Sequence, residues 1–319
     1  MVRVETGARV HFGFQNLSLA HERLYGGVGV TLAEPRVVVE ATPSDELDAD
    51  PELRETAARA VDLLDLPGVR VRLVAGLPRH VGLGSGTQHA LTTLAAVARA
   101  YDYDPCVRER APALGRGGRS GVGVAGFESG GFVVDAGHPT ERFTTAPPPK
   151  GEWTVPPVLA RHDVPADWRF LLVVPEGTGK HGDDEDESMR AVVERADPAI
   201  ADEAAALLLR GVLPAVATGD RERFGAAVGE FGRLNGAWYA DEQGGVYRPP
   251  AGELIETLRG ARVVSGVGQS SWGPTVYGVT DERDAAAARE AAEDALDTVG
   301  VAGEVSVVAP RNAGARVVE

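Results

Sequence analysis

A predicted strand, a glycine loop and a predicted helix follow one another between residues 69 and 101, and this unit constrains the fold most. In residues 69–75 apolar side chains alternate with arginines, as in a half-exposed strand. The loop at 82–87, GLGSGT, follows, and apolar residues then recur at three- and four-residue spacing, which predicts an amphipathic helix starting at about Thr87. Backbone N–H groups and the positive end of a helix dipole favour anions. The unit therefore predicts a phosphate cradle.

The glycine loop differs from two common nucleotide-binding loops. A Walker A loop requires a lysine directly after its last glycine, whereas Thr87 and Gln88 follow Gly86. The glycine spacing does not fit a dinucleotide fingerprint either. Backbone groups must therefore supply most of the binding. The alternative is a tight strand-to-helix turn that binds nothing.

A second glycine string, GVGVAG at 121–126, does match the dinucleotide pattern GxGxxG. That fingerprint must follow a strand and open a helix. Here the string follows GRGGRS and leads into a segment that we interpret as loop and strand, so we reject NAD binding. Arg116 and Arg119, beside Ser120, predict a grip on phosphate or carboxylate instead. Solvated loop arginines are the alternative.

A third glycine-rich loop, SGVGQSSWGPTVYG at 265–278, joins two predicted strands. Trp272 stands in a polar setting where its ring could stack on an aromatic substrate, and the alternative is that it covers a hydrophobic edge. His11 lies on a predicted strand, where a core histidine is as expected as a ligand contact. The acidic run at 182–188 is typical of a solvated segment. No HExxH, GxSxG or paired CxxC motif supports a hydrolase or a zinc site.

The order of predicted elements indicates an α+β chain of two domains, 1–145 and 146–319. Residues 111–137 are rich in glycine and end in a predicted strand at 131–135, and residues 144–167 hold six prolines and suggest a linker. Strands and helices do not alternate as in a doubly wound fold. The other predicted strands are 2–14, 25–32, 35–43, 168–177, 261–268, 275–280 and 303–310, and the other predicted helices are 51–64, 188–218, 220–235, 251–259 and 281–298.

Composition excludes several classes of protein. The 319 residues carry a net charge of −15, and lysine supplies just two of the 32 basic residues, Lys150 and Lys180. This balance argues against a nucleic-acid partner and suggests a halophilic source, or alternatively a GC-rich genome. The single cysteine, Cys106, excludes an internal disulfide framework. With no signal peptide and no apolar run of about 20 residues, we expect a cytoplasmic protein without a membrane partner.

The three loops, in this order, resemble those of the GHMP small-molecule kinase superfamily. Its central phosphate loop is PxxxGLGSS-like, which residues 78–86, PRHVGLGSG, fit well, and its last glycine motif is similar to 265–278. The resemblance covers nearly the whole chain. It implies the GHMP kinase fold, with an N-terminal domain like ribosomal protein S5 domain 2 and a C-terminal ferredoxin-like α/β sandwich.

Within that superfamily, five stretches look like the β-ribofuranosylaminobenzene 5′-phosphate synthases of the archaeal methanopterin pathway. That family condenses phosphoribosyl pyrophosphate with 4-aminobenzoate or 4-hydroxybenzoate, releasing CO2 and pyrophosphate and forming a C-riboside. Many of the kinases carry an aspartate in an SG[IVT]D string, where this chain has Gly123, and glycine cannot take a proton. The resemblance therefore favours the phosphoribosyltransferase. The five stretches are ARVHFGF, YGGVGVTLAEPRVVVEA, GLGSGTQHAL, GRGGRSGVGVAGFESGGFVVDAG and GQSSWGPTVYG.

The resemblance also implies roles for the candidate residues. Phosphate or pyrophosphate is assigned to Gly82, Leu83, Gly84, Ser85, Gly86 and Thr87. The assigned catalytic residues are Arg116 and Arg119, for the remaining anionic groups, and His11, near the reacting carboxylate or the para substituent. The assigned substrate-binding residues are Ser120, Gly121, Gln269, Ser270, Ser271 and Trp272. Mg2+ is the expected cofactor, held mostly by substrate oxygens because no carboxylate stands out as its ligand.

Two other functions stay open. One is an ATP-dependent kinase of a small alcohol or acid on the same fold, and the other is a phosphate or nucleotide sensor that has lost its chemistry. The expected partners are small molecules, phosphoribosyl pyrophosphate and an aromatic acid, and a homodimer is left open.

Overall fold

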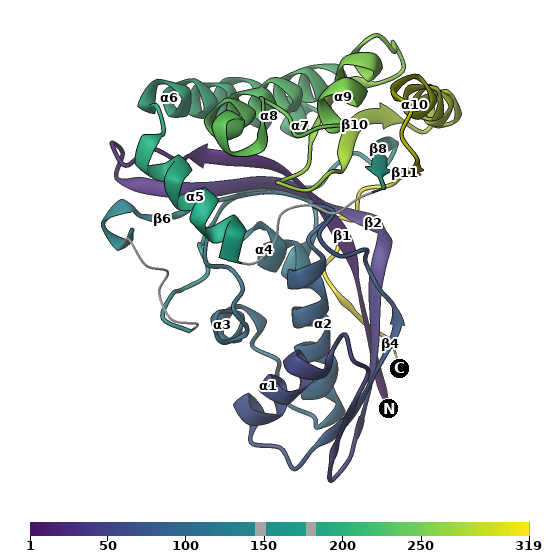
Figure 1. The fold of residues 1–319 in the computed structure, drawn as a ribbon. Helices are drawn as coiled ribbons and strands as arrows, with labels where there is room; N and C mark the ends of the chain where they lie inside the picture. The colour runs from purple at the N-terminus through teal and green to yellow at the C-terminus, as the bar shows by residue number, and fades with distance from the viewer. Residues whose placement is uncertain (144–150, 177–182, 319) are drawn as a thin grey trace.

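The computed structural model describes residues 1–143, 151–176 and 183–318, without the side chains of residues 183–186. A large sheet and a smaller one are covered by helices (Figure 1). The strands are β1 Val2–Asn16, β2 Arg23–Pro43, β3 Leu47–Ala49, β4 Val69–Ala75, β5 Phe132–Asp135, β6 His138–Pro139, β7 Val158–His162, β8 Trp168–Pro175, β9 Ser265–Gln269, β10 Val276–Asp281, β11 Gly303–Val308 and β12 Arg316–Val318. The α-helices are α1 Arg54–Leu64, α2 Ser85–Ala100, α3 Val107–Arg110, α4 Val122–Ser129, α5 Asp183–Arg195, α6 Pro198–Leu207, α7 Leu213–Thr218, α8 Arg221–Gln243, α9 Ala251–Arg259 and α10 Ala285–Val299.

Two long antiparallel strands, β1 and β2, are the centre of the larger sheet, whose order is β12-β1-β2-β4-β3. The predicted strands 25–32 and 35–43 are one continuous strand, β2, since both pair with β1 on either side of an irregularity after Gly7. One end of β2 also pairs with β5, and β5 pairs with β7. At the other edge β12 pairs with β1, so the first and the last strand of the chain lie side by side, with Arg3 opposite Val318 (Figure 1).

Helix α2 packs on β1 and β2 and is buried along most of its length, because α1 and α4 lie beside it. The predicted amphipathic helix is confirmed, with its start at Ser85 rather than Thr87. The smaller sheet has the order β11-β8-β10-β9 and packs against α8, α9 and α10. Phe12 of β1, Phe132 of β5, Trp168 of β8 and Phe224 of α8 form a shared aromatic cluster. The fold class, α+β, is as predicted.

The glycine string at 121–126 corrects one prediction, because it opens helix α4 rather than a loop and strand. Glycine disfavours helices in isolation, but here it permits close packing. A Cβ at Gly123 would lie 3.0 Å from Thr87 Cγ2, and one at Gly126 would lie 2.5 Å from Thr31 Oγ1. The string still follows the 3-10 turn Pro112–Leu114 and a loop rather than a strand, so the context of a dinucleotide fingerprint is not met.

Strand pairing crosses between the two predicted halves of the chain. β7 lies in the segment predicted to be a linker, and β12 lies where no strand was predicted, yet both pair with strands of the larger sheet. The predicted boundary between residues 145 and 146 lies outside the described residues, as does part of the acidic run at 182–188. Among the helices that the structure describes, none has the length and apolar character needed to cross a membrane.

Candidate active site

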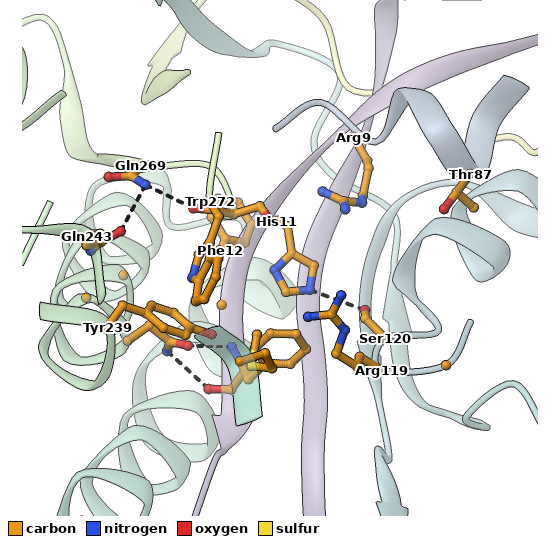
Figure 2. A pocket seen from close by; sticks show the side chains of 18 of the residues that line it. Arg9, His11, Phe12, Thr87, Arg119, Ser120, Tyr239, Gln243, Gln269 and Trp272 are labelled. Atoms are coloured by element: carbon orange, nitrogen blue, oxygen red, sulfur yellow. Dashed lines mark hydrogen bonds between the residues drawn. The ribbon is translucent and has the colours of Figure 1, made fainter. Parts of the chain in front are cut away.

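A cavity of about 200 Å³ opens where β1, the loop before α4, helix α8 and the loop after β9 meet (Figure 2). It brings together predicted residues from four separate segments of the sequence. Those in its lining are His11, Thr87, Arg116, Arg119, Ser120, Gln269, Ser271 and Trp272. Lining residues that the sequence analysis did not single out include Arg9, Phe14, Asn235, Tyr239, Gln243 and Tyr247.

The cavity is strongly basic. Arg9, Arg116 and Arg119 line it, and no Asp or Glu occurs among the described lining residues. Arginine recognises phosphate and carboxylate through paired N–H donors. An environment of this kind favours polyanionic substrates over cations.

The glycine loop lies at one side of this cavity, where Gly84 precedes helix α2 in the left-handed conformation with a φ of 81°. The first N–H groups of a helix lack intrahelical acceptors, and the dipole is positive there. The Arg116 guanidinium lies over this helix start, since Nη1 would be 2.8 Å from a Cβ at Gly86. A side chain at residue 86 would displace Arg116. The helix start and the guanidinium together are suited to one phosphate group.

Of the predicted phosphate-binding residues, Thr87 lines the cavity, while Gly82, Leu83, Gly84, Ser85 and Gly86 are not in its described lining. Their loop is held against the loop after β9. Thr275 Oγ1 donates a hydrogen bond of 2.6 Å to the carbonyl of Val81, and a Cβ at Gly273 would lie 2.2 Å from that carbonyl carbon. The smaller sheet therefore positions the glycine loop.

Ser270 and Gly121 differ from the other predicted substrate-binding residues, since neither is in the described lining. Ser270 is fully buried; its hydroxyl accepts from the His11 N–H at 3.1 Å and donates to the Gly82 carbonyl at 2.8 Å. It thus joins β1 to the glycine loop. The Gly121 N–H donates to Asp135 Oδ2 at 2.7 Å. In the described structure, both residues bond to the protein itself.

His11 lies on β1 with a side chain that is 3% exposed. Its Nε2 is 3.2 Å from the hydroxyl of Ser120, and its ring contacts the Phe14 ring edge-on, with the centroids 4.9 Å apart. Burial, followed by repulsion from Arg9 and Arg119, holds the pKa of His11 well below its usual value. The imidazole is therefore neutral near pH 7 and is able to accept a proton.

An aromatic wall faces His11 across the cavity (Figure 2). Trp272 is 7% exposed and packs edge-on against Tyr239 of α8, with ring centroids 4.9 Å apart. Gln269 holds the loop in place by donating to the carbonyl of Ser271 at 3.2 Å and accepting from the N–H of Arg248 at 2.8 Å. Trp272 therefore both covers the core and borders the cavity.

Comparison with known proteins assigns the chain to a family. Family models for the GHMP kinases N terminal domain and for GHMP kinases C terminal match residues 52–131 and 212–298. The beta-ribofuranosylphenol 5'-phosphate synthase of Methanothermobacter thermautotrophicus is 34% identical over 98% of this chain and 97% of its own length. The enzyme of that name from Archaeoglobus fulgidus is 34% identical over 88% of each chain. This chain belongs to the beta-ribofuranosylphenol 5'-phosphate synthase family.

The synthase family shares its fold with kinases of known structure. Phosphomevalonate kinase of Streptococcus pneumoniae superposes with a TM-score of 0.70 over 98% of this chain and 100% of its own, at 13% identity. L. major mevalonate kinase gives a TM-score of 0.68 at 15% identity, over 98% of this chain and 97% of its own. At such low identity the likeness establishes the fold and carries no statement about the reaction.

In this synthase-family chain, sequence reasoning missed one residue of the cavity lining and one residue that bonds to the lining residue Ser120, although the sequence pattern could have indicated both. Arg9 stands two positions before His11 on a strand, so both side chains lie on one face, and this period was available from the sequence. Asp135 ends the apolar strand Phe132–Asp135 and is fully buried. A buried carboxylate at a strand end is costly without partners, and such a residue is therefore a candidate for a specific role. Asn235 and Tyr239 of α8 carried no comparable signal.

Proposed function

We propose that this chain is a phosphoribosyltransferase that condenses phosphoribosyl pyrophosphate with a para-substituted benzoate, releasing CO2 and pyrophosphate and forming a C-riboside 5′-phosphate for methanopterin-type pterin synthesis. The observation that carries the proposal is near-full-length similarity to synthases of this kind. A cavity that combines three arginines with an aromatic wall supports it, because one substrate is a polyanion and the other an aromatic acid.

The acceptor that we favour is 4-hydroxybenzoate over 4-aminobenzoate. The relatives are named for a ribofuranosylphenol, and a phenol product follows from an acceptor that carries a hydroxyl para to its carboxylate. Both acceptors have an electron-donating para group. The sequence analysis left both acceptors open, and this proposal selects 4-hydroxybenzoate.

Apart from proton transfers, the proposed reaction breaks one bond at the sugar and one at the ring, and forms one bond between the two. The bond from ribose C1 to pyrophosphate breaks, and positive charge develops at C1. The ring carbon that bears the carboxylate bonds to C1, and loss of CO2 returns the electron pair that restores aromaticity. The proton of the para hydroxyl leaves as the ring attacks and returns to that oxygen in the product.

The proposed roles of the protein groups follow from their positions. The start of α2 with Arg116 binds one phosphate group, and Arg119 and Arg9 neutralise the others, as preorganised charge stabilises a departing anion. His11 is neutral and takes the para proton. Trp272 and Tyr239 border the acceptor ring and exclude water from the charged centre at C1.

Magnesium enters this proposal with the substrate. In the described ranges no group of three or more His, Cys, Asp or Glu side chains is placed to hold a metal ion, and the described lining contains arginines but none of the carboxylates by which proteins usually hold Mg2+. These residues therefore do not fit a resident metal. We propose that Mg2+ arrives on the oxygens of phosphoribosyl pyrophosphate. A cytoplasmic location and a homodimer stay predictions from the sequence.

The test is incubation with phosphoribosyl pyrophosphate and carboxyl-labelled 4-hydroxybenzoate. Release of labelled CO2 with equal amounts of pyrophosphate and of a C-riboside is the expected result. Parallel incubations contain 4-aminobenzoate, or ATP with small alcohols and acids. Turnover of ATP without CO2 release would identify the chain as a kinase, and tight binding of phosphates without any turnover would identify a sensor.

A further inference from the structure

Three polar side chains that are distant in sequence form a continuous chain of hydrogen bonds beside the cavity. His11 Nε2 lies 3.2 Å from Ser120 Oγ, and Ser120 Oγ lies 3.1 Å from Asp135 Oδ2. His11 and Asp135 are buried, with side chains 3% and 0% exposed, and Ser120 connects them. Asp135 itself is absent from the described lining of the cavity.

The donors around Asp135 determine the direction of these bonds. The N–H of Gly121 donates to Oδ2 at 2.7 Å, and the N–H of Gly137 donates to Oδ1 at 2.8 Å. The Ser120 hydroxyl donates its single proton to Asp135 Oδ2 at 3.1 Å, so both oxygens of this carboxyl group accept hydrogen bonds. Burial raises the pKa of Asp135, whereas the bonds from Gly137, Gly121, Gly27 and Ser120 oppose that rise.

With its proton directed at Asp135, Ser120 Oγ can only accept from its other neighbours. The N–H of Val122 donates to it at 3.2 Å, and His11 Nε2 must therefore carry a proton to make the remaining bond. In a neutral imidazole the other nitrogen, Nδ1, then has a free electron pair. Figure 2 shows Nε2 turned toward Ser120 and the other ring nitrogen on the side of Trp272.

The three side chains pack against the backbone of Gly27 on β2. A Cβ at this position would lie 2.1 Å from Ser120 Oγ, 2.8 Å from Asp135 Oδ2 and 2.9 Å from His11 Nε2. Residue 27 thus has no room for a side chain while the three residues keep their contacts. This offers a way to disturb the contacts without replacing any of the three.

We propose that Asp135 is a positioning residue that acts through Ser120 to hold His11 in the Nε2–H tautomer, so that Nδ1 is the base that the acceptor meets. The catalytic part of this inference rests on the proposed function, whereas the tautomer does not. Orienting partners of this kind fix both the rotation and the tautomer of a catalytic histidine.

The experiment combines ring 15N NMR of the whole protein with steady-state kinetics. The His11 ring signals are assigned by their loss in His11→Gln. The wild-type protein is expected to give the Nε2–H pattern near neutral pH. Ser120→Ala removes the acceptor, so the Nδ1–H form should appear, and kcat should fall by roughly tenfold to a hundredfold with KM for phosphoribosyl pyrophosphate unchanged.

Matched variants separate positioning from folding. Ser120→Thr retains a hydroxyl and should restore the Nε2–H pattern and most of kcat. Gly27→Ala should also make the Nδ1–H form of His11 appear and lower kcat, as Ser120→Ala does. Ser129→Ala, which removes a serine hydroxyl bonded to the Ala125 carbonyl on the neighbouring helix, should leave both readouts as in the wild type.

Two results would overturn the inference: an unchanged tautomer in Ser120→Ala, or a changed tautomer with kcat within about twofold of the wild type. Asp135→Asn should shift the tautomer and lower kcat as Ser120→Ala does, and a folded Asp135→Asn protein with the wild-type tautomer would also overturn the inference. If Asp135→Asn fails to fold, the Ser120 variants still test whether the hydrogen bonds to His11 fix its tautomer. A wild-type protein with the Nε2–H pattern and no transferase activity would contradict the proposed function and the catalytic part of the inference, while the positioning of the ring by Asp135 and Ser120 would stand.

Discussion

The His11 Nε2 and the Ser120 hydroxyl lie 3.2 Å apart although 109 residues separate them in the sequence. The contact exists because β2 and β5 bring the loop before α4 beside β1. Through Ser120 it joins a neutral imidazole to the buried carboxylate of Asp135, beside a cavity whose charged lining residues, among those that the structure describes, are arginines. A base that stays neutral among cations is suited to remove a proton from an acceptor while anionic groups are held nearby.

Replacing His11 with glutamine tests its role as the base. The amide nitrogen of glutamine can still donate to Ser120, but the variant has no ring nitrogen to accept a proton. General-base catalysis contributes ~100-fold to ~10,000-fold, so kcat should fall by that order while KM for phosphoribosyl pyrophosphate changes little. CO2 release measures the loss. His162→Gln, on β7 outside the described lining, is the matched control, and an equal loss in both variants would contradict the assignment.

Arg116 is expected to bind the phosphate at the start of α2. Arg116→Ala should raise KM for phosphoribosyl pyrophosphate by about tenfold to a hundredfold, because hydrogen bonds to charged groups contribute ~1.5–3 kcal/mol. The KM of Arg116→Lys should lie between those of the wild type and Arg116→Ala, since lysine retains the charge and loses the paired donors. Arg223→Ala, at a side chain that is 84% exposed, is the control. An unchanged KM in Arg116→Ala would mean that Arg116 does not bind phosphoribosyl pyrophosphate.

Much of the fold could be predicted because periodic patterns are local. The alternation in 69–75 and the spacing after Thr87 placed β4 and α2 correctly, and α9 has the predicted bounds, 251–259. Helix α4 could not be predicted this way. Its glycines lower the helix propensity of the segment, and the contacts with Thr87 and Thr31 that favour it come from residues far away in the sequence.

The site was predictable in its parts but not in its contacts. Trp272 was singled out because a tryptophan is unusual in a polar loop, and Arg119 because it forms a basic pair with Arg116; the structure places both in the cavity lining. That Ser270 bonds to the backbone of His11 and Gly82 depends on how two sheets meet. No spacing within the sequence encodes that meeting. The roles assigned to these residues stay predictions until the variants are measured.

Trp272 is expected to bind the aromatic acceptor. Trp272→Phe keeps a ring and should change KM for the acid little. Trp272→Ala should raise KM for the acid by about twofold to tenfold, since aromatic pairs contribute ~0.5–1.5 kcal/mol. Because the side chain is buried against Tyr239, the alanine variant should also lose ~3–5 kcal/mol of the free energy of unfolding. Lost stability with unchanged KM would mean that Trp272 merely covers the core.

Removal of magnesium separates a substrate-borne metal from a resident one. If Mg2+ arrives with phosphoribosyl pyrophosphate, a chelator should abolish turnover, and added Mg2+ should restore it in proportion to the concentration of the metal complex of the substrate. The midpoint of thermal unfolding of the protein without substrate should be the same with and without chelator. A lower midpoint in chelator would indicate a resident metal.

The free energy of unfolding is expected to fall as the pH drops below about 6.5, the ordinary pKa of histidine. Burial lowers the pKa of His11 in the folded protein, so below that pH the unfolded chain binds a proton that the folded chain does not. Each such group lowers the free energy of unfolding by up to about 1.4 kcal/mol per pH unit, until the pH reaches its folded-state pKa. His89 and His138, whose pKa values burial also lowers, add to the slope. The free energy of unfolding can be measured by urea unfolding at fixed ionic strength between about pH 5 and pH 7.5. It should therefore change less steeply with pH in His11→Gln than in the wild type. Equal slopes in the two proteins would contradict a buried, neutral His11.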